Sequence, residues 1–406
     1  MIKITKFAKE SGSYLTDAIS EFKIPQQPPK DKKKFWFLSG DMTMYGHKNV
    51  RMAEEGYEIV RKTIENPQNH QQNFSHGSLK AREKLAQEFS TENIKLTSDD
   101  VILTHGVNVG LIHSILCLAN EGDNILIPEP SYPFYQKTAK SLNVEAKPYK
   151  LLPEKDWEID LGFMEQIIDE KTKFIWVVNP SNPCGSIFSK NHMYEIFQLA
   201  KKHNKILIFD EVYFNESFEG FQFTSASEIV KDQPLILLGG MEKTFCVPGW
   251  CVSWAIFYDP KCQIKPIIQA FMQSNSLIAT PPEIISNALP DILDKLTLNF
   301  TKQLMPIFKQ SYDHLLQQLT QIKGLKPIEA KGTFYLSVLI QMEHFPQFKN
   351  DQEFLQRLLE EQNIFLLSLN CFGGGQHGFR MMMAAPLEYY DGFYESLSEF
   401  CLKYYC

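Results

Sequence analysis

Three apolar segments of this 406-residue chain each end in a short polar stretch. They cover residues 174–178, 206–209 and 235–238. Continuous apolar runs that alternate with helical segments are typical of parallel strands covered on both faces of a sheet. In such sheets the ligand lies beyond the carboxyl ends of the strands. The sequence therefore predicts a site where the polar residues that follow these three strands meet.

The polar residues at these strand ends suit one kind of ligand. In chain order they are Asn182, Asp210, Tyr213 and Lys243. A lysine that is partly desolvated has a lowered pKa and can form a Schiff base with an aldehyde. A buried carboxylate such as Asp210 needs a cation, and a protonated pyridine nitrogen would supply one. Taken singly, Lys243 also fits a surface position and Asp210 an ordinary strand end, so the prediction rests on the set.

Helical and strand-like segments alternate from residue 79 to residue 238, which predicts an α/β fold with a doubly wound sheet. After residue 262 the pattern changes to two long helices, at 281–293 and from 296 to about 322. A smaller α+β segment follows, with strands at 333–340, 364–367 and 379–385 and a last helix at 389–405. We expect an N-terminal arm that joins a small domain (1–65), a large domain (66–299) and the rest of the small domain (300–406).

Composition and charge limit the classes of function. The net charge of −7 does not favour a nucleic-acid partner, and no segment approaches the run of about 18 apolar residues that spans a membrane. The first ten residues lack the apolar core of a secretory signal. The eight cysteines form no CxxC pair, which does not favour a metal site. We expect a reduced, cytoplasmic protein that binds no metal.

Three further positions are candidates for the same site. Gly106 precedes a helix expected at 107–119, and the free N–H groups of Val107 and Asn108 at such a helix start can bind phosphate. Tyr132 lies at another strand-to-helix junction, where it would stack on a planar ligand or belong to the core. Arg380 stands in an apolar strand and needs an anion, either a substrate carboxylate or a structural partner.

Four segments, at 151–161, 179–186, 247–250 and 342–346, resemble motifs of the class I aminotransferases of fold type I, in the same order. The second, Asn-Pro-Ser-Asn-Pro-Cys-Gly-Ser, is similar to a family loop, and the resemblance covers residues 37–406. These enzymes use pyridoxal 5′-phosphate (PLP). The resemblance implies a large domain with a mostly parallel, seven-stranded-type sheet covered by helices, and a smaller α+β domain built from both ends of the chain. It also implies a homodimer.

The resemblance implies a role for each candidate. Lys243 would hold PLP as a Schiff base and move the substrate proton, and Asp210 would pair with the ring nitrogen. The other cofactor-binding residues would be Tyr213 and Asn182 at the ring oxygen, Tyr132 on the ring face, and Gly106, Val107 and Asn108 at the phosphate. Arg380 would bind the substrate α-carboxylate, with Asn182 and the Gly40 backbone beside it.

The departures from the family pattern gather where the phosphate would bind. Cys251 stands where the family has an arginine, and Val107 where it has a small residue. Residues 71–76 contain no tyrosine, although the family places one there, and Glu242 replaces a small residue next to Lys243. Each lost charged hydrogen bond would cost about 1.5–3 kcal/mol. We therefore expect the PLP fold with a weakened phosphate site.

The resemblance, which is strongest to the branch that acts on tyrosine, implies transamination of an aromatic L-amino acid with 2-oxoglutarate. Two alternatives stay open on the sequence. One is a degenerate homologue that binds PLP weakly, which the phosphate-site departures favour. The other is a related PLP-dependent lyase that cleaves a C–S or other β bond. The identity of the products would separate the lyase from the aminotransferase.

Overall fold

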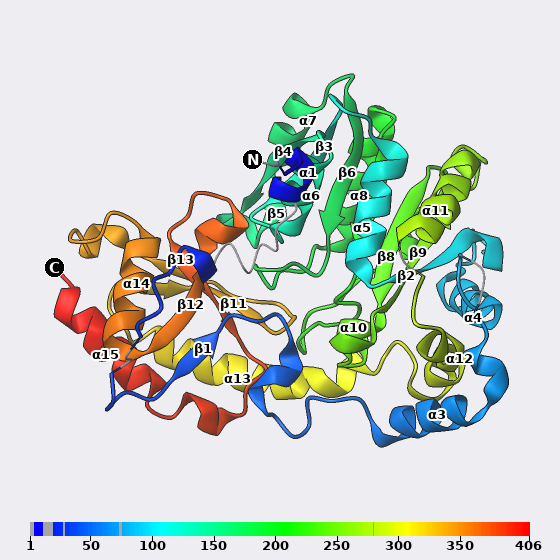
Figure 1. Ribbon diagram of the computed structural model, residues 1–406. Helices are drawn as coiled ribbons and strands as arrows, with labels where there is room; N and C mark the ends of the chain where they lie inside the picture. The colour runs from blue at the N-terminus through cyan, green and yellow to red at the C-terminus, as the bar shows by residue number, and fades with distance from the viewer. Residues whose placement is uncertain (1–3, 11–18, 27–28, 73–74, 279) are drawn as a thin grey trace.

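The computed structural model describes residues 4–10, 19–26, 29–72, 75–278 and 280–406, and these form two sheets with helices packed around them (Figure 1). The larger sheet has eight strands in the order β2-β9-β8-β7-β6-β3-β4-β5. Their bounds are β2 (Val101–His105), β3 (Asn124–Glu129), β4 (Glu145–Leu152), β5 (Glu158–Ile159), β6 (Thr172–Val178), β7 (Ile206–Asp210), β8 (Leu235–Gly240) and β9 (Val252–Tyr258). Strands β3, β4, β6, β7 and β8 run parallel, which confirms the mostly parallel sheet, while β9 is antiparallel to β2 and β8.

Both faces of the larger sheet are buried, as the continuous apolar runs predict. Alternate residues of one strand belong to two different cores: Leu207 and Phe209 of β7 face one, and Ile208 faces the other. Helices α5 (Val107–Leu118), α6 (Phe134–Ser141) and α11 (Lys265–Ile278) contribute to the core on the face of Ile208. Helix α8 (Lys190–Lys202) packs on the opposite face, and its N-cap Ser189 accepts a hydrogen bond from the His192 N–H.

The smaller sheet joins the two ends of the chain. Its strand order is β1-β12-β13-β11-β10, with β1 (Phe35–Phe37), β10 (Leu325–Pro327), β11 (Tyr335–Ile340), β12 (Ile364–Ser368) and β13 (Gly378–Met382). Strand β1 pairs in parallel with β12, so the N-terminal segment is fixed to the C-terminal part. Helices α13 (Thr301–Leu319), α14 (Asp351–Gln362) and α15 (Phe393–Tyr404) surround this sheet (Figure 1).

A second group of helices lies beyond β2. Helix α3 (Glu54–Glu65) and helix α4 (Leu79–Phe89) both pack against α12 (Glu283–Leu296). The boundaries of the three expected parts, at 65 and 299, stay a proposal. The strands of the larger sheet all fall between residues 101 and 258, and those of the smaller sheet fall outside that range.

The sequence patterns missed several elements. Strand β9 and helix α11 were not predicted, and neither were strand β10 and helix α14. Strand β9 follows β8 without a long helix between them, because it returns antiparallel to β8 rather than through a βα unit. The expectation of repeated βα units therefore fails here, and it also fails at β5, which returns antiparallel to β4.

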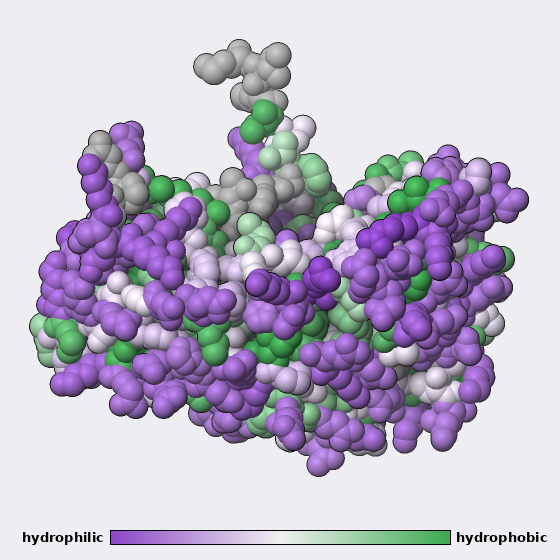
Figure 2. All heavy atoms as spheres, turned by 90° about the horizontal axis from the view of Figure 1, so that it is seen from below, coloured by the Kyte–Doolittle hydropathy of each residue, from purple (hydrophilic) through white to green (hydrophobic). Residues whose placement is uncertain are grey.

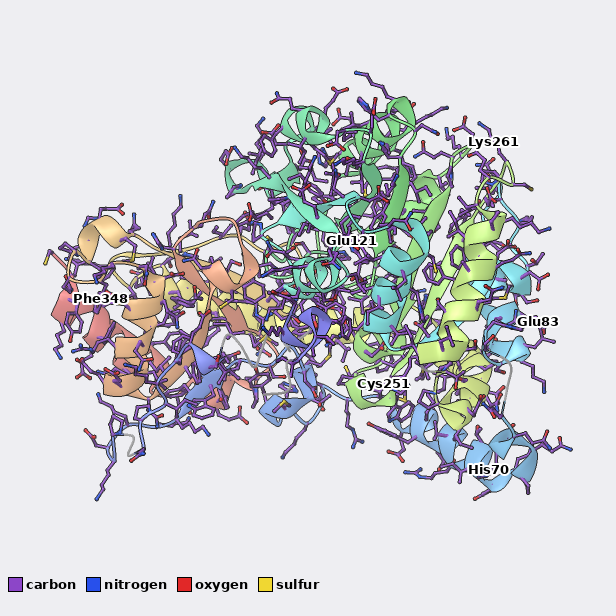
Figure 3. The ribbon with its side chains drawn as sticks, turned by 45° about the horizontal axis from the view of Figure 1, so that its top comes forward. His70, Glu83, Glu121, Cys251, Lys261 and Phe348 are labelled. Atoms are coloured by element: carbon purple, nitrogen blue, oxygen red, sulfur yellow. The ribbon has the colours of Figure 1, made fainter. Side chains whose placement is uncertain are left out.

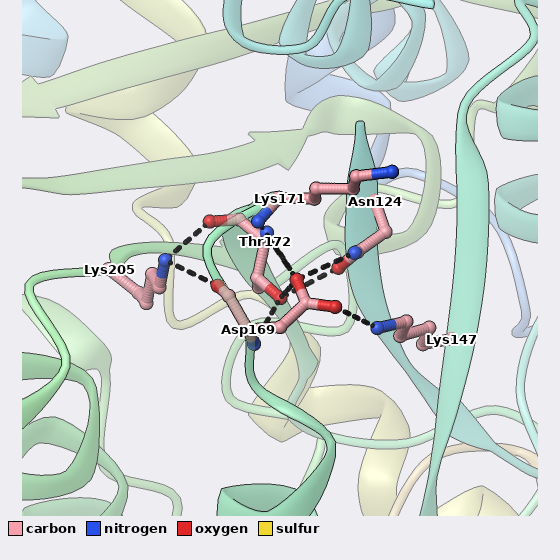
Figure 4. Close-up of polar contacts among 6 residues, drawn as sticks. All are labelled: Asn124, Lys147, Asp169, Lys171, Thr172 and Lys205. Carbon is pink, nitrogen blue, oxygen red and sulfur yellow. Dashed lines mark hydrogen bonds and ion pairs between the residues drawn. The ribbon is translucent and has the colours of Figure 1, made fainter. Parts of the chain in front are cut away.

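A polar network fixes the amino ends of the parallel strands, at the end of the sheet opposite to the predicted site (Figure 4). Asp169 accepts hydrogen bonds from the Lys147 ammonium at 2.5 Å and the Asn124 amide at 2.9 Å. These bonds hold the pKa of Asp169 well below its usual range. Lys205 donates to the Asp169 and Thr172 carbonyl oxygens at 3.0 and 2.7 Å. The network ties β3, β4, β6 and the start of β7 together, which sets the register of their carboxyl ends.

On the face seen in Figure 2, hydrophilic side chains cover most of the surface and hydrophobic ones occur in small groups. Of the helices in the described ranges, none combines the length and the hydropathy needed to cross a membrane. All eight cysteines are free thiols.

Candidate active site

A cavity of about 430 Å³ lies at the carboxyl ends of β6, β7 and β8. All four residues predicted from the strand ends line it, namely Asn182, Asp210, Tyr213 and Lys243. Of the other candidates, Gly40, Gly106, Val107, Asn108 and Tyr132 also line it, whereas Arg380 does not. The structure therefore places the amide, the acid, the phenol and the lysine around one cavity, while their roles stay a prediction.

Lys243 reaches the cavity from the short helix α10 (Met241–Thr244), which begins directly after β8. Its Nζ donates to the Gly40 carbonyl oxygen at 2.7 Å. Burial lowers the pKa of Lys243, while the carboxylates of Glu242, Asp41 and Glu216 act in the opposite direction. A lowered pKa raises the fraction of neutral amine, which is the form that attacks an aldehyde.

Asp210 is the last residue of β7 and is almost completely buried. Its Oδ2 accepts a hydrogen bond from the Tyr135 hydroxyl at 2.8 Å, and its Oδ1 accepts one from the Val212 N–H at 3.1 Å. Burial raises the pKa of Asp210 to about 6, and these two hydrogen bonds partly oppose that rise. A cation placed next to Asp210 would favour the charged form.

Tyr135 and Tyr335 are site residues that sequence reasoning missed. Tyr135 lies on α6, three positions after Tyr132, so the helical spacing was a signal that it shares the same face. Tyr335 lies on β11 of the smaller sheet, and its hydroxyl is 3.0 Å from the hydroxyl of Tyr213. No sequence pattern points to Tyr335, because only the packing of the two sheets brings it to the cavity.

Asn182 links the cavity to Arg380. The Asn182 Oδ1 accepts a hydrogen bond from Arg380 Nη1 at 3.0 Å, so its amide N–H groups remain as donors. Arg380 is fully buried, and its Nη2 donates to the Leu38 carbonyl at 3.1 Å. Its guanidinium lies over the rings of Tyr335 and Phe372, with centroids at 4.6 and 4.8 Å.

Arg380 has no anionic partner among the interactions found in the described residues, and its Nε has no hydrogen-bond partner there. A buried guanidinium in this condition can still bind a carboxylate. Arg380 adjoins the cavity through Asn182 and Tyr335, which both line it. Its predicted role toward the substrate carboxylate stays a prediction.

The start of helix α5 forms one end of the cavity. Gly106 has a φ of 76°, which favours glycine, and its N–H donates to the Cys251 carbonyl oxygen at 2.9 Å. Tyr132 lies nearby, stacked on Phe134 with ring centroids 5.8 Å apart. Figure 3 shows Cys251 just below the cyan helix α5.

The residues fit the ring of PLP better than its phosphate. An amine, a buried acid and two donors surround the space at Lys243, as a pyridine aldehyde requires. At the start of α5, where a phosphate would be expected, the cavity wall carries the Glu242 carboxylate and the Cys251 thiol. Residues 71–76, where the family places a tyrosine and this chain has none, lie partly outside the described residues, because Asn73 and Phe74 are not among them.

Comparisons with known proteins agree with this site. The family model for aminotransferase class I and II matches residues 32–394. The tyrosine aminotransferase of Mus musculus is 33% identical over 380 residues, which cover 93% of this chain and 83% of the mouse protein. The S-alkyl-thiohydroximate lyase of Arabidopsis thaliana is 31% identical over 333 residues, covering 81% of this chain and 72% of the lyase. The crystal structure of tyrosine aminotransferase from Leishmania infantum has a TM-score of 0.93 and 26% identity, and covers 100% of this chain and 99% of that chain.

The chain belongs to the class I and II aminotransferases, and its fold is fold type I of the PLP-dependent transferases. Within this family it is similar to tyrosine aminotransferases over almost its whole length. It is thus an aminotransferase for which family and fold both imply PLP as the cofactor.

Proposed function

We propose that the chain transfers the amino group of an aromatic L-amino acid, tyrosine foremost, to 2-oxoglutarate. The products are the keto acid of the amino acid, 4-hydroxyphenylpyruvate in the case of tyrosine, and glutamate. The observation that carries the proposal is the single cavity in which Lys243, Asp210, Tyr213 and Asn182 meet. The similarity to tyrosine aminotransferases supports the choice of amino acid.

The chain's own residues divide the work. PLP, when bound, supplies an aldehyde and an electron-withdrawing ring. Lys243 would provide the amine that holds the aldehyde and would move the proton at the α-carbon of the amino acid. Asp210, which accepts a hydrogen bond from Tyr135, would keep a proton on the ring nitrogen. Tyr213 and Asn182 would donate to the ring oxygen.

The remaining candidates bind and orient. Tyr132 would pack on the face of the ring, and Gly106, Val107 and Asn108, which line the same cavity, would lie at its phosphate end. Arg380 receives the α-carboxylate of the amino acid, with Asn182 and the Gly40 backbone beside it. The Lys243 amine donates to the Gly40 carbonyl oxygen. Binding of the substrate carboxylate beside Gly40 and breaking of this hydrogen bond are therefore linked.

The absorption spectrum of the purified protein with added PLP tests this function. We expect a visible band that is absent from the Lys243→Ala variant, that shifts to the near ultraviolet with L-tyrosine, and that returns with 2-oxoglutarate. A band that L-tyrosine leaves unchanged would reject the aromatic substrate. The lack of any Lys243-dependent band at high PLP would favour the degenerate homologue, which the Cys251 and Glu242 positions support.

The similarity to an S-alkyl-thiohydroximate lyase supports a second candidate, a PLP-dependent C–S cleavage. Release of a thiol from an S-alkyl substrate without formation of glutamate would favour the lyase.

We also propose that the protein is a cytoplasmic homodimer. Light scattering of the purified protein tests the homodimer, and imaging of the tagged chain in its cell tests the compartment.

A further inference from the structure

The carboxylate of Glu242 lies at the start of helix α5. Burial raises the pKa of this carboxylate, and the Val107 N–H, the first of that helix, acts in the opposite direction. A β-carbon added at Gly106 would be 3.4 Å from the Glu242 Oε1, so the carboxylate borders the turn that leads into the helix. The free N–H groups of a helix start, and the positive end of its dipole, attract anions. In this chain the carboxyl group of Glu242 lies at that position.

The space for this carboxylate is built by its neighbours. The Ser253 hydroxyl lies 2.6 and 2.7 Å from the two oxygens of Glu242. Gly240 pairs with Ser253 across strands β8 and β9. A β-carbon at Gly240 would lie 2.0 Å from the Glu242 Oε2 and 2.2 Å from the Ser253 Oγ. Only the absence of a side chain at Gly240 lets Glu242 fold back to this position.

The charges at this end of the cavity are unfavourable for a phosphate. Among the described residues that line the cavity, Lys243 is the only lysine or arginine, and it lies at the ring end. Of the titratable groups, Lys243 on the same helix and the Cys251 thiol before β9 interact electrostatically with Glu242, and His105 at the end of β2 lines the same cavity. A phosphate placed at the start of α5 would compete with Glu242 for the Val107 N–H and would face a carboxylate of the same charge.

We propose that Glu242 takes the place of the cofactor phosphate at the start of α5. Glu242 is then a specificity-determining residue, because the pocket holds a pyridoxal-type ring with little contribution of the phosphate to the binding free energy. The inference rests on the proposed function, because it assumes that the cavity holds such a ring. The presence of Cys251 in place of the family's arginine only removes a phosphate contact. The inference adds a group of the protein, the Glu242 carboxylate, that competes with the phosphate. Protonation of Glu242, which its burial favours, would remove the competition.

A pair of ligands that differ only by the phosphate tests the proposal. Pyridoxamine and pyridoxamine 5′-phosphate bind without a covalent bond to Lys243, so the ratio of their dissociation constants reports the contribution of the phosphate alone. The ratio is measured by calorimetry at pH 8 on the full chain, its Glu242→Gln variant and a matched control, Glu216→Gln. Glu216 is also a buried carboxylate whose charge acts on Lys243, but it does not line the cavity.

We expect Glu242→Gln to raise the preference for the phosphorylated ligand at least tenfold, because it removes a full charge next to the phosphate. Glu216→Gln should change the ratio less than about threefold, since it acts on both ligands alike. A selective rise below tenfold, or an equal change in the two variants, overturns the proposal. In the unaltered chain the preference for the phosphorylated ligand should also increase as the pH falls, because Glu242 becomes protonated. The increase should be steeper than in Glu242→Gln, where only the phosphate of the ligand titrates.

Inorganic phosphate gives a second measurement that needs no pyridine ring. Thermal unfolding with added phosphate should show protection of Glu242→Gln that exceeds the protection of Glu216→Gln and of the unaltered chain. Equal protection in all three overturns the proposal. If neither pyridoxamine ligand binds any of the proteins, the proposed function fails, and the phosphate measurement still decides the role of Glu242.

Discussion

The hydrogen bond from Tyr135 to Asp210 gives the sharpest test of how the site works. The bond is 2.8 Å long and buried, and it is among the interactions that oppose the rise of the Asp210 pKa to about 6. A hydrogen bond to a charged group is worth about 1.5–3 kcal/mol. At 1.36 kcal/mol per pKa unit, Tyr135→Phe should raise the pKa of Asp210 by about one to two units.

The sign of the effect follows from the role of Asp210. Its carboxylate must be ionised to keep a proton on the ring nitrogen, so ring binding weakens as the pH falls through its pKa. In Tyr135→Phe this loss should begin about one to two pH units higher than in the unaltered protein. The assay is calorimetric binding of pyridoxamine between pH 5 and 9. The other groups that titrate in this range are the same in both proteins, so a difference between the two pH profiles reports the Tyr135 hydroxyl.

Tyr149→Phe is the matched control for this test. It also removes a buried hydroxyl, but that hydroxyl donates to the Trp176 carbonyl oxygen at 2.6 Å and does not touch Asp210. The control should keep the pH profile of the unaltered protein even if it loses some stability. Identical profiles for Tyr135→Phe and the unaltered protein would refute the reasoning, because Tyr135 would then have no influence on the charge of Asp210.

Three more predictions concern residues of the cavity and a buried carboxyl group outside it. Cys251→Arg should tighten the binding of PLP about tenfold or more. The gain should be larger together with Glu242→Gln, since the new guanidinium would otherwise pair with the Glu242 carboxylate. An unchanged dissociation constant in PLP titrations would exclude a weakened phosphate site. Burial raises the pKa of Glu216 from 4.5 to about 8, so the folded state binds an extra proton in that range and loses stability as the pH rises. Glu216→Gln should therefore unfold at a higher temperature than the unaltered protein at pH 8, by about 1 kcal/mol or more in free energy, and calorimetric scans at pH 8 and 5 should show the gain shrinking at pH 5. Arg380→Lys should weaken a substrate carboxylate contact about ten- to a hundredfold in kcat/KM while the PLP absorption band persists, and loss of that band instead would give Arg380 a purely structural role.

The residues of the cavity differ in how far the sequence reveals them. Asn182, Asp210, Tyr213 and Lys243 follow three strands that the apolar runs mark clearly, and parallel strands bring their carboxyl ends together. The position of these four residues directly after the strands in the sequence was enough to place them in one site. Tyr135 carried a weaker signal, because only its helical spacing from Tyr132 linked it to the cavity.

Tyr335 and Glu242 belong to the other group. Tyr335 reaches Tyr213 from the smaller sheet, more than a hundred residues away along the chain. Glu242 stood out in the sequence as an unusual neighbour of Lys243, but its place at the start of α5 depends on Gly240 and Ser253 from two adjacent strands. No pattern of spacing encodes such contacts.

The sequence by itself determined the α/β class, the main strands of the larger sheet and the chemistry at their ends, because the periodicity of apolar residues and the type of polar residue are local properties. The tertiary structure decided the rest. It turned β9 antiparallel, placed β1 beside β12, enclosed Arg380 between two rings, and folded Glu242 back over Gly240 toward the start of α5. These features arise where segments distant in the chain pack together, and packing depends on the shape and charge of both partners at once.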